Sequence, residues 1–327
     1  MRESINILFT SSGRRVALIN KFRNVFEEKG IEGRIITADL KDNAPTKFVS
    51  DKHYIVPRVN QESYLHSLLK ICEVEKIKIL IPLIDTELKL LGEKKIQFHA
   101  LGVKVIISGS ELNILAGNKK KTHDFFISNN ISTPKIYSDH ELNNDLFNFP
   151  LIIKPFDGSS SEGVTLVNNK RELSFFREYI SNPIIQEYIE GEEFTIDVMV
   201  DFDNNIKTIV PRLRIETRSG EVSKGMTVKD FSIIKEVKKV INLLPDPVGC
   251  ITLQCFKQKD GTIKFIEINP RFGGGVPLSI EAGANFPLWI IEMCTGQNVG
   301  KEDYNWKSGL TMLRYDEALF IEGAYVN

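Results

Sequence analysis

The first third of the chain alternates short apolar runs with segments whose apolar residues recur at helical spacing. Ile5 to Phe9 reads as a buried strand, and residues 16–29 read as a helix with apolar positions three or four residues apart. Further strand-like runs and another helix follow, at residues 34–40, 52–57, 64–75, 78–83 and 104–109. Strands and helices in alternation predict a small doubly wound parallel sheet, which we place in residues 1–115.

The pattern changes twice more along the chain. Residues 116–190 open with a helix and continue with a strand, a Ser/Gly loop, a second strand, a helix from Arg171 and a third strand. Residues 191–327 are richer in strands, with one helix around Ile233 to Leu244 followed by two more strands. We therefore expect an α/β and α+β chain with three domains, at residues 1–115, 116–190 and 191–327.

Two of these strands flank Asp260-Gly261, a strong short signal for a β-hairpin. If these two residues form the loop, counting outward pairs Gln254 with Glu267 and Thr252 with Asn269. Directly paired residues have Cβ atoms about 4.5 to 5.5 Å apart, and residues two apart in a strand share a face. The hairpin therefore predicts one patch of oxygen donors, although a merely solvated strand face is the alternative.

Gln254, Glu267 and Asn269 suit magnesium, which takes oxygen ligands and usually completes its shell with substrate phosphates. Arg271 follows the second strand, and its planar fork can take two oxygens of a phosphate or carboxylate. The glycines at 273–275 allow close approach by a ligand, but such runs are more often simple turns.

A second positively charged candidate is Lys154, at the end of an apolar strand. The loop that follows is small and polar, and its backbone N–H groups could bind phosphate oxygens; it contains Gly158, Ser159, Ser160, Ser161 and Gly163. The loop lacks the Walker A ending, and the chain has no protein-kinase motifs. A flexible hairpin loop beside a snorkelling lysine is the alternative.

Three other stretches offer candidate ligand contacts. Residues 183–197 read as strand, bend and strand, where a hinge could meet an adenine edge and Glu193 a ribose. Three lysines, 119–121, precede a predicted helix, where cations oppose the macrodipole and so suggest a ligand. Arg212 and Arg214 share a strand face, with Arg218 and Lys224 in a following loop, and suit an anionic carboxylate or acyl phosphate. Surface solubility competes with each interpretation.

Composition narrows the partners. The 327 residues are 42% hydrophobic and carry a net charge of −1, so no global field favours nucleic acid or a membrane surface. The four cysteines lack CxxC spacing, and neither a zinc site nor a disulfide framework is expected. The first apolar run is too short for a signal sequence, and no apolar run reaches about 18 residues. We expect a cytoplasmic protein with no nucleic-acid or membrane partner.

Taken in order, these features resemble the ATP-grasp superfamily, and most closely its short stand-alone ligases similar to the large chain of carbamoyl-phosphate synthase. The resemblance runs nearly the whole length. The family's first domain is similar to the segment that opens ILFTSSGRRVALI and contains IPLIDTEL. The family's D-K-x-x-T pattern resembles Asn118 to Thr122, where the acidic position is missing and either Lys119 or Lys121 could be the first ATP lysine.

The resemblance also implies roles for the other candidates. Lys154 matches the second ATP lysine, the loop at 158–163 the phosphate cover, and Glu193 the ribose carboxylate. The adenine hinge is similar to Gln186, Glu187, Tyr188 and Ile189. The family's magnesium ligands fall on Gln254, Glu267 and Asn269, its phosphate-contacting arginine on Arg271, and its substrate-side arginines on Arg212 and Arg214.

The chemistry implied is an ADP-forming carboxylate–amine ligation through an acyl phosphate, with ATP and Mg²⁺, or Mn²⁺ in its place. The substrates would be a small carboxylate and an amine, with amino acids as the default, and a homodimer is compatible. The second substrate would meet the N-terminal domain, where Arg14, Asp85 and Glu87 are candidates. The rival from another class is an ATP-binding sensor or assembly protein without catalysis. A nicotinamide-dependent oxidoreductase is disfavoured because TSSGRR lacks G-x-G-x-x-G.

Overall fold

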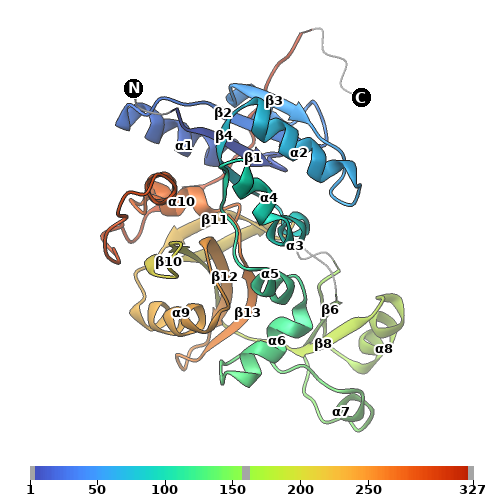
Figure 1. Cartoon of the computed structure of the whole chain (residues 1–327). Helices are drawn as coiled ribbons and strands as arrows, with labels where there is room; N and C mark the ends of the chain where they lie inside the picture. The colour runs from blue at the N-terminus through green and yellow to red at the C-terminus, as the bar shows by residue number, and fades with distance from the viewer. Residues whose placement is uncertain (1–3, 157–162, 323–327) are drawn as a thin grey trace.

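The computed structural model describes residues 4–156 and 163–322, and it contains three sheets (Figure 1). The N-terminal sheet is parallel, with the strand order β3-β2-β1-β4-β5. Its strands are β1 (Asn6–Thr10), β2 (Ile35–Asp39), β3 (Lys52–Ile55), β4 (Ile77–Pro82) and β5 (Lys104–Val105). The helices and one 3-10 turn are α1 (Val16–Lys29), η1 (Pro45–Val49), α2 (Ser63–Val74), α3 (Asp85–Glu93) and α4 (Lys95–Ala100). The predicted doubly wound sheet is confirmed.

The order of this sheet has a functional consequence. The chain runs outward from β1 through β2 to β3, and then returns to place β4 on the other side of β1. Ligands of doubly wound sheets bind outside the carboxyl ends of the strands, where the strand order reverses. The residues that follow β1 and β4 therefore lie at the favoured edge.

A three-stranded antiparallel sheet follows, in the order β7-β6-β8. It consists of β6 (Leu151–Pro155), β7 (Thr165–Val167) and β8 (Pro183–Glu187), with α7 (Asp139–Asn143) and α8 (Lys170–Tyr179) beside it. The helices α5 (Ser110–Ala116) and α6 (Lys119–Ser128) connect it to the rest of the molecule (Figure 1). The small sheet has its own apolar core, built around Leu151, Ile153 and Val167.

The C-terminal sheet has six strands in the order β13-β12-β9-β10-β11-β14. They are β9 (Glu192–Val200), β10 (Ile206–Arg218), β11 (Glu221–Thr227), β12 (Gly249–Lys257), β13 (Ile263–Asn269) and β14 (Thr311–Leu313). The helices are α9 (Phe231–Leu243), α10 (Val276–Glu281) and α11 (Phe286–Cys294). Sequence periodicity missed β11, β14 and the last two helices. Arg218 and Lys224, predicted in a loop, lie in β10 and β11.

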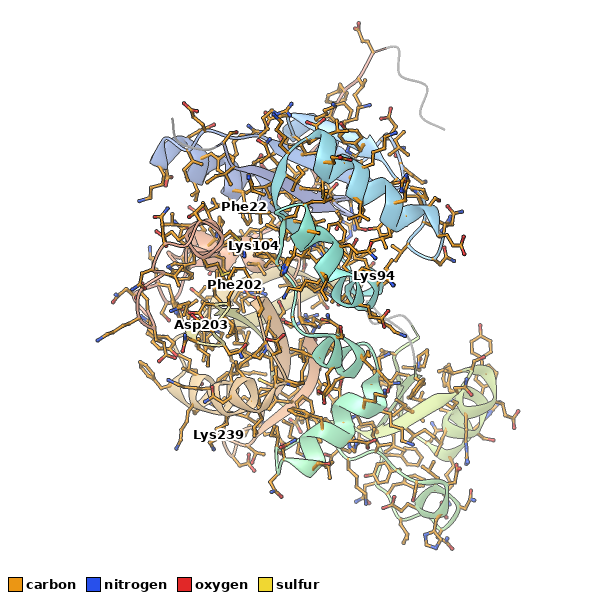
Figure 2. All side chains as sticks on the ribbon, in the orientation of Figure 1. Phe22, Lys94, Lys104, Phe202, Asp203 and Lys239 are labelled. Carbon is orange, nitrogen blue, oxygen red and sulfur yellow. The ribbon has the colours of Figure 1, made fainter. Side chains whose placement is uncertain are left out.

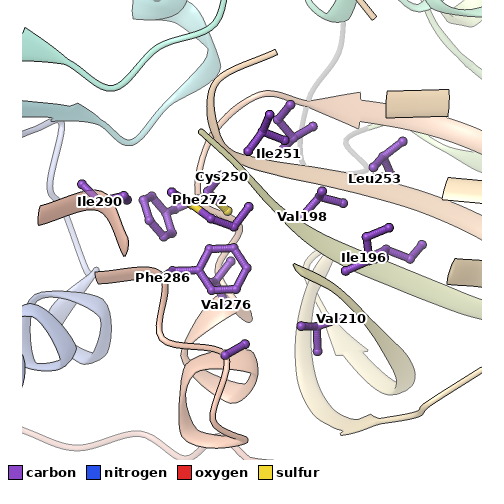
Figure 3. Packing of buried hydrophobic residues seen from close by; sticks show 14 of the residues in the cluster. Ile196, Val198, Val210, Cys250, Ile251, Leu253, Phe272, Val276, Phe286 and Ile290 are labelled. Atoms are coloured by element: carbon purple, nitrogen blue, oxygen red, sulfur yellow. The ribbon is translucent and has the colours of Figure 1, made fainter. Parts of the chain in front are cut away.

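Alternation along β9 separates a core face from a polar face. Phe194, Ile196 and Val198 are buried in the apolar core, where Ile196 and Val198 pack near Ile251 and Leu253 of β12 (Figure 3). The residues between them are polar and point to the opposite face. That polar face carries the candidate site.

The apolar core also joins the N-terminal and C-terminal domains. Phe22 of α1 lies at this junction (Figure 2), and its ring meets that of Phe272 edge-on with centroids 6.1 Å apart. Phe272 in turn contacts Phe286 of α11, with ring centroids 6.3 Å apart (Figure 3). The packed aromatic rings thus join α1 of the N-terminal domain to the segment after β13 and to α11.

The hairpin of β12 and β13 confirms the predicted pairings but not the predicted loop. Gln254 pairs with Glu267, and Thr252 with Asn269. At the turn, Gly261 has φ +88° and its N–H donates to the carbonyl of Gln258, so the loop has three residues and not two. A bulge after Gln254 makes Ile266 an extra residue. The two one-residue shifts cancel, which restores the expected register at the site.

Candidate active site

The predicted metal ligands converge on the polar face of the C-terminal sheet. Gln254, Glu267 and Asn269 line one pocket of about 130 Å³. Within the described residues, the side chains of Gln254 and Glu267 form no hydrogen bond or ion pair. Three oxygen donors on adjacent strands, two of them unused, fit a hard cation such as Mg²⁺.

The donor set is poor in charge. Among the described residues, no group of three or more His, Cys, Asp or Glu side chains gathers as a metal site. Glu267 is the one carboxylate of the predicted trio, and the other two side chains are amides. Such a set leaves positions for phosphate oxygens and water, which is the usual way that Mg²⁺ binds in nucleotide sites.

Arg271 borders the same pocket and joins two domains. Its Nη2 lies 2.7 Å from Oδ2 of Asp85, the first residue of α3, and 3.4 Å from Oδ1 of Asn269. Burial lowers the pKa of Arg271, but Asp85 and Glu267 raise it more, so the pKa stands above its ordinary value. Within the described residues its Nε is buried without a hydrogen-bond partner. Arg271 is a permanent cation beside the predicted metal trio.

Arg212 is held by a buried carboxylate. Its Nε and Nη2 donate to the two oxygens of Asp197, at 2.7 and 2.8 Å, and both side chains are at most 1% exposed. Ser279 Oγ donates to the same carboxylate at 2.6 Å. The remaining Nη1 of Arg212 has no hydrogen-bond partner in the described part of the chain. A Cβ on Gly275 would lie 2.2 Å from this atom, so glycine is required there.

Arg214 lies one step along the same face and pairs with Glu193, Nε to Oε1 at 3.1 Å. It also donates to Thr195 Oγ1 at 3.2 Å and to the carbonyl of Gly220 at 3.0 Å. Burial raises the pKa of Glu193, Arg214 lowers it, and Glu267 raises it, with a net rise. Glu193, predicted as the ribose carboxylate, is thus partly engaged by an arginine.

The two predicted phosphate lysines meet in a small cavity between the three-stranded sheet and β13. Lys119, Lys154 and Gln186 line it, together with Ile266 and His123. Burial and the nearby Lys119 lower the pKa of Lys154 to about 8, while Glu267 opposes the shift. Two cations at such a place fit the phosphates of a nucleotide. The bulged Ile266 supplies an apolar surface to the same cavity.

The structure distinguishes the candidate lysines of α6. Lys119 begins the helix and lines the cavity, whereas Lys121 is exposed. Asn118, at the position where the family pattern has an acid, caps the helix, and its Oδ1 accepts from the N–H of Lys121 at 2.9 Å. The lysines thus lie in the first turn of the helix and not before it.

The predicted adenine hinge follows β8. Gln186 is buried and its Nε2 donates to the carbonyl of Pro134 at 3.2 Å, while the carboxylate of Glu187 accepts from Lys264 and from the N–H of Lys135. The backbone N–H of Glu187 donates to the carbonyl of Lys135 at 2.9 Å, so the backbone of this residue is already paired. Ile189 is buried and Tyr188 is 44% exposed.

In the predicted phosphate loop, Gly163 has φ +71°, and Gly158, Ser159, Ser160 and Ser161 lie outside the described residues.

On the N-terminal side, Asp85 reaches the pocket as predicted, but its two companions do not. Arg14 is exposed, and the neighbouring Arg15 lines the pocket in its place. Glu87 is buried, accepts from the hydroxyl of Tyr64, and caps α3 through the N–H groups of residues 83 and 84. The signal that could have found Arg15 is its place just after β1, at the carboxyl edge of the sheet.

Other cations near the site are engaged elsewhere. Arg218 pairs with Asp316 at the surface, and Lys224 pairs with Glu216. The imidazole of His123, which sequence reasoning also missed, has a buried Nε2 without a hydrogen-bond partner among the described residues. His123 lies one helical turn after Lys119, so both point to the same cavity.

Comparison with known proteins agrees with this geometry. A family model described as "PylC-like, N-terminal domain" matches residues 7–106, and one described as "ATP-grasp domain" matches residues 116–275. A D-alanine–D-alanine ligase of Fusobacterium nucleatum is 32% identical over 191 residues, which cover 56% of this chain and 66% of that protein. The carbamoyl phosphate synthase large chain of Thermoanaerobacter sp. is 25% identical over 233 residues, or 64% of this chain and 21% of the relative.

Solved structures share the fold. The N5-carboxyaminoimidazole synthetase of Staphylococcus aureus, complexed with ADP, superimposes with a TM-score of 0.72 at 19% identity, over 92% of this chain and 80% of that one. Within the described residues, no helix is long and apolar enough to cross a membrane. The two family models together cover both the parallel-sheet domain and the site, and the chain carries an ATP-grasp domain preceded by a PylC-like N-terminal domain.

Proposed function

We propose that this protein is an ADP-forming carboxylate–amine ligase. A carboxylate oxygen attacks the γ-phosphorus of ATP, so that an O–P bond forms and ADP leaves. The amine then attacks the acyl carbon, a C–N bond forms, and phosphate and a proton depart. The observation that carries the proposal is the convergence of Gln254, Glu267 and Asn269 with Arg271 on one polar face.

The residues of the chain divide this work by position. Lys119 and Lys154 hold the α and β phosphates. Glu267, Gln254 and Asn269 would hold Mg²⁺, which would supply positive charge to offset the charge of the nucleotide phosphates. Arg271 holds the transferring phosphoryl group, and its pairing with Asp85 fixes the direction of the guanidinium.

The carboxylate substrate belongs next to the arginines of β10. Arg212 and Arg214 are both held rigidly by carboxylates, so neither loses much side-chain entropy on binding an anion. Nη1 of Arg212 is a buried donor that has no hydrogen-bond partner among the described residues. These contacts support a small carboxylate or acyl phosphate as the ligand of this wall.

The site supports small substrates because its pocket is small. The named activity of the D-alanine–D-alanine ligase relative supports amino acids as substrates, although the match spans 66% of that protein.

Three of the four free cysteines are buried, which agrees with a cytoplasmic enzyme. A homodimer is compatible with this assignment, and size-exclusion chromatography with light scattering tests it.

The experiment is an ADP-release screen of paired amino acids and small carboxylates with ATP and Mg²⁺. Glu267→Ala serves as the blank because it removes the one carboxylate of the predicted metal trio. We expect ADP, phosphate and an amide in equal amounts from at least one pair. If ATP binds well but no pair ever releases ADP above the blank, the protein is a nucleotide sensor and the ligase proposal fails.

A further inference from the structure

The arginines that line the pocket do not all form ion pairs with carboxylates that the structure describes. Four arginines line it: Arg15, Arg212, Arg214 and Arg271. Three have an ion-pair partner, in the pairs Arg212–Asp197, Arg214–Glu193 and Arg271–Asp85. Arg15 forms no hydrogen bond or ion pair through its side chain to any residue that the structure describes.

The surroundings of Arg15 disfavour an unmatched charge. Burial lowers the pKa of its guanidinium, and the facing Arg271 lowers it further, against the weaker pull of Glu221 and Asp85. A partly buried guanidinium opposite a second one is stabilised by an anion between or beside them. Glu221 and Asp85 attract Arg15, but neither forms an ion pair with it within the described residues, so the guanidinium can still take the anion of a ligand.

The position of Arg15 indicates which ligand. Arg15 directly precedes α1, at the carboxyl end of β1 and next to the point where the strand order of the parallel sheet reverses. The phosphate machinery and the arginines of β10 belong to the other sheets. Arg15 therefore belongs to the part of the pocket lining that the N-terminal domain contributes, together with Asp85.

Gly274 and Glu221 shape the space in front of this guanidinium. A Cβ on Gly274 would lie 2.8 Å from Nη1 of Arg15 and 3.4 Å from Oε2 of Glu221, so any side chain there would intrude between them. Glu221 is itself held by Arg314, whose Nη1 lies 3.0 Å from the same Oε2 and whose N–H donates to the carbonyl of Ser223 at 2.9 Å. The wall thus offers a cation and a restrained carboxylate side by side.

We propose that Arg15 binds a carboxylate carried by the amine substrate, which makes the acceptor an amino acid or another amino carboxylate. Ammonia or a simple amine would leave the guanidinium unmatched. Glu221, which lies beside Arg15 near Gly274, accepts a hydrogen bond from the amine and orients its lone pair towards the acyl carbon. The inference rests on the proposed ligase function, and it adds the class of the acceptor and a residue for it.

Binding is tested first because it does not depend on turnover. Saturation-transfer NMR is run on the full chain with ADP and Mg²⁺, using a mixture of the twenty amino acids and, separately, the amines that lack their carboxylates. We expect at least one amino acid to give a signal that its amine does not give. That signal should disappear in Arg15→Gln, weaken in Arg15→Lys and persist in Arg14→Gln, the exposed neighbouring arginine.

A kinetic assay separates an effect on acceptor binding from an effect on formation of the acyl phosphate. Hydroxylamine replaces the acceptor and has no carboxylate, so hydroxamate formation reports activation alone. Arg15→Gln should keep hydroxamate formation within about twofold of wild type, while KM for the amino acid acceptor rises at least tenfold, the loss expected from one charge-assisted contact of about 1.5 to 3 kcal/mol. Arg14→Gln should change neither.

Three other outcomes would overturn the inference. Equal loss of hydroxamate and amide would place Arg15 on the acyl phosphate. Equal binding of amines and amino acids, or an unchanged signal in Arg15→Gln, would show that Arg15 takes no carboxylate. If wild type binds an amino acid through Arg15 but releases no ADP with any donor, the ligase proposal fails while the anion site stands.

Discussion

Lys154 carries a prediction whose size can be worked from its surroundings. Its ammonium lies in the cavity between β6 and β13, and burial together with Lys119 lowers its pKa from 10.5 to about 8. At about 1.4 kcal/mol per pKa unit, holding the charge there costs the protein without nucleotide about 3 kcal/mol at neutral pH. Bound phosphates remove that cost because they favour the charged form.

Two opposite pH dependences follow. The unfolded chain keeps this proton up to about pH 10.5, and the folded chain releases it near pH 8. The unfolded state therefore binds more protons between these values, and the contribution of Lys154 to the free energy of unfolding rises with pH across that window. Nucleotide affinity falls over the same range, since the free site must regain a proton before it can bind phosphate.

The magnitude is about tenfold. With a pKa of about 8, roughly nine-tenths of the free sites carry the proton at pH 7 and roughly one-tenth at pH 9. Isothermal titration with ADP and Mg²⁺ at constant ionic strength should therefore give a dissociation constant about ten times larger at pH 9. ADP is used because it binds the same lysines without turnover.

Matched variants make the test specific. Lys154→Arg keeps its charge at both pH values, so its affinity should not depend on pH between them. Lys121→Met, which removes an exposed lysine of the same region, should behave like wild type. Lys154→Met should lose ADP binding and raise the free energy of unfolding at pH 7 by up to about 3 kcal/mol in urea. A wild-type affinity that stays flat, or an equal fall in Lys154→Arg, would refute the reasoning.

Three further predictions test other parts of the site. Glu267→Ala should lower ADP release at least 100-fold but change the free energy of unfolding by less than about 1 kcal/mol, because the carboxylate forms no ion pair in the described structure; retained activity would exclude the metal role. Asp197→Asn should destabilise the fold by about 3 to 5 kcal/mol in urea, since it leaves Arg212 buried without a counter-charge; a loss below 1 kcal/mol would contradict this. His123→Ala should weaken ADP binding about fivefold through one lost hydrogen bond, whereas the exposed His140→Ala should not.

Local patterns along the chain were enough for much of the architecture. Buried strands and amphipathic helices are set by which residues recur at spacings of two or three to four, so the N-terminal sheet could be read directly. The metal trio could also be predicted, because the residues that pair across an antiparallel hairpin can be counted outward once the turn is located. Even so, the count succeeded because a bulge at Ile266 offset the extra loop residue, and neither shift was visible in the sequence.

What the tertiary structure decided is which charges meet. Arg212 and Asp197 lie on paired strands, but Asp85 reaches Arg271 from another domain, 186 residues away in sequence. Arg15 enters the pocket and Arg14 does not, because the turn after β1 directs adjacent side chains to different sides. Charged residues that are distant in sequence interact when the fold brings them together, so which charges are paired depends on how the sheets pack. The sequence alone determined most of the elements and the oxygen donors, and the assembled domains determined which arginine remains for a substrate.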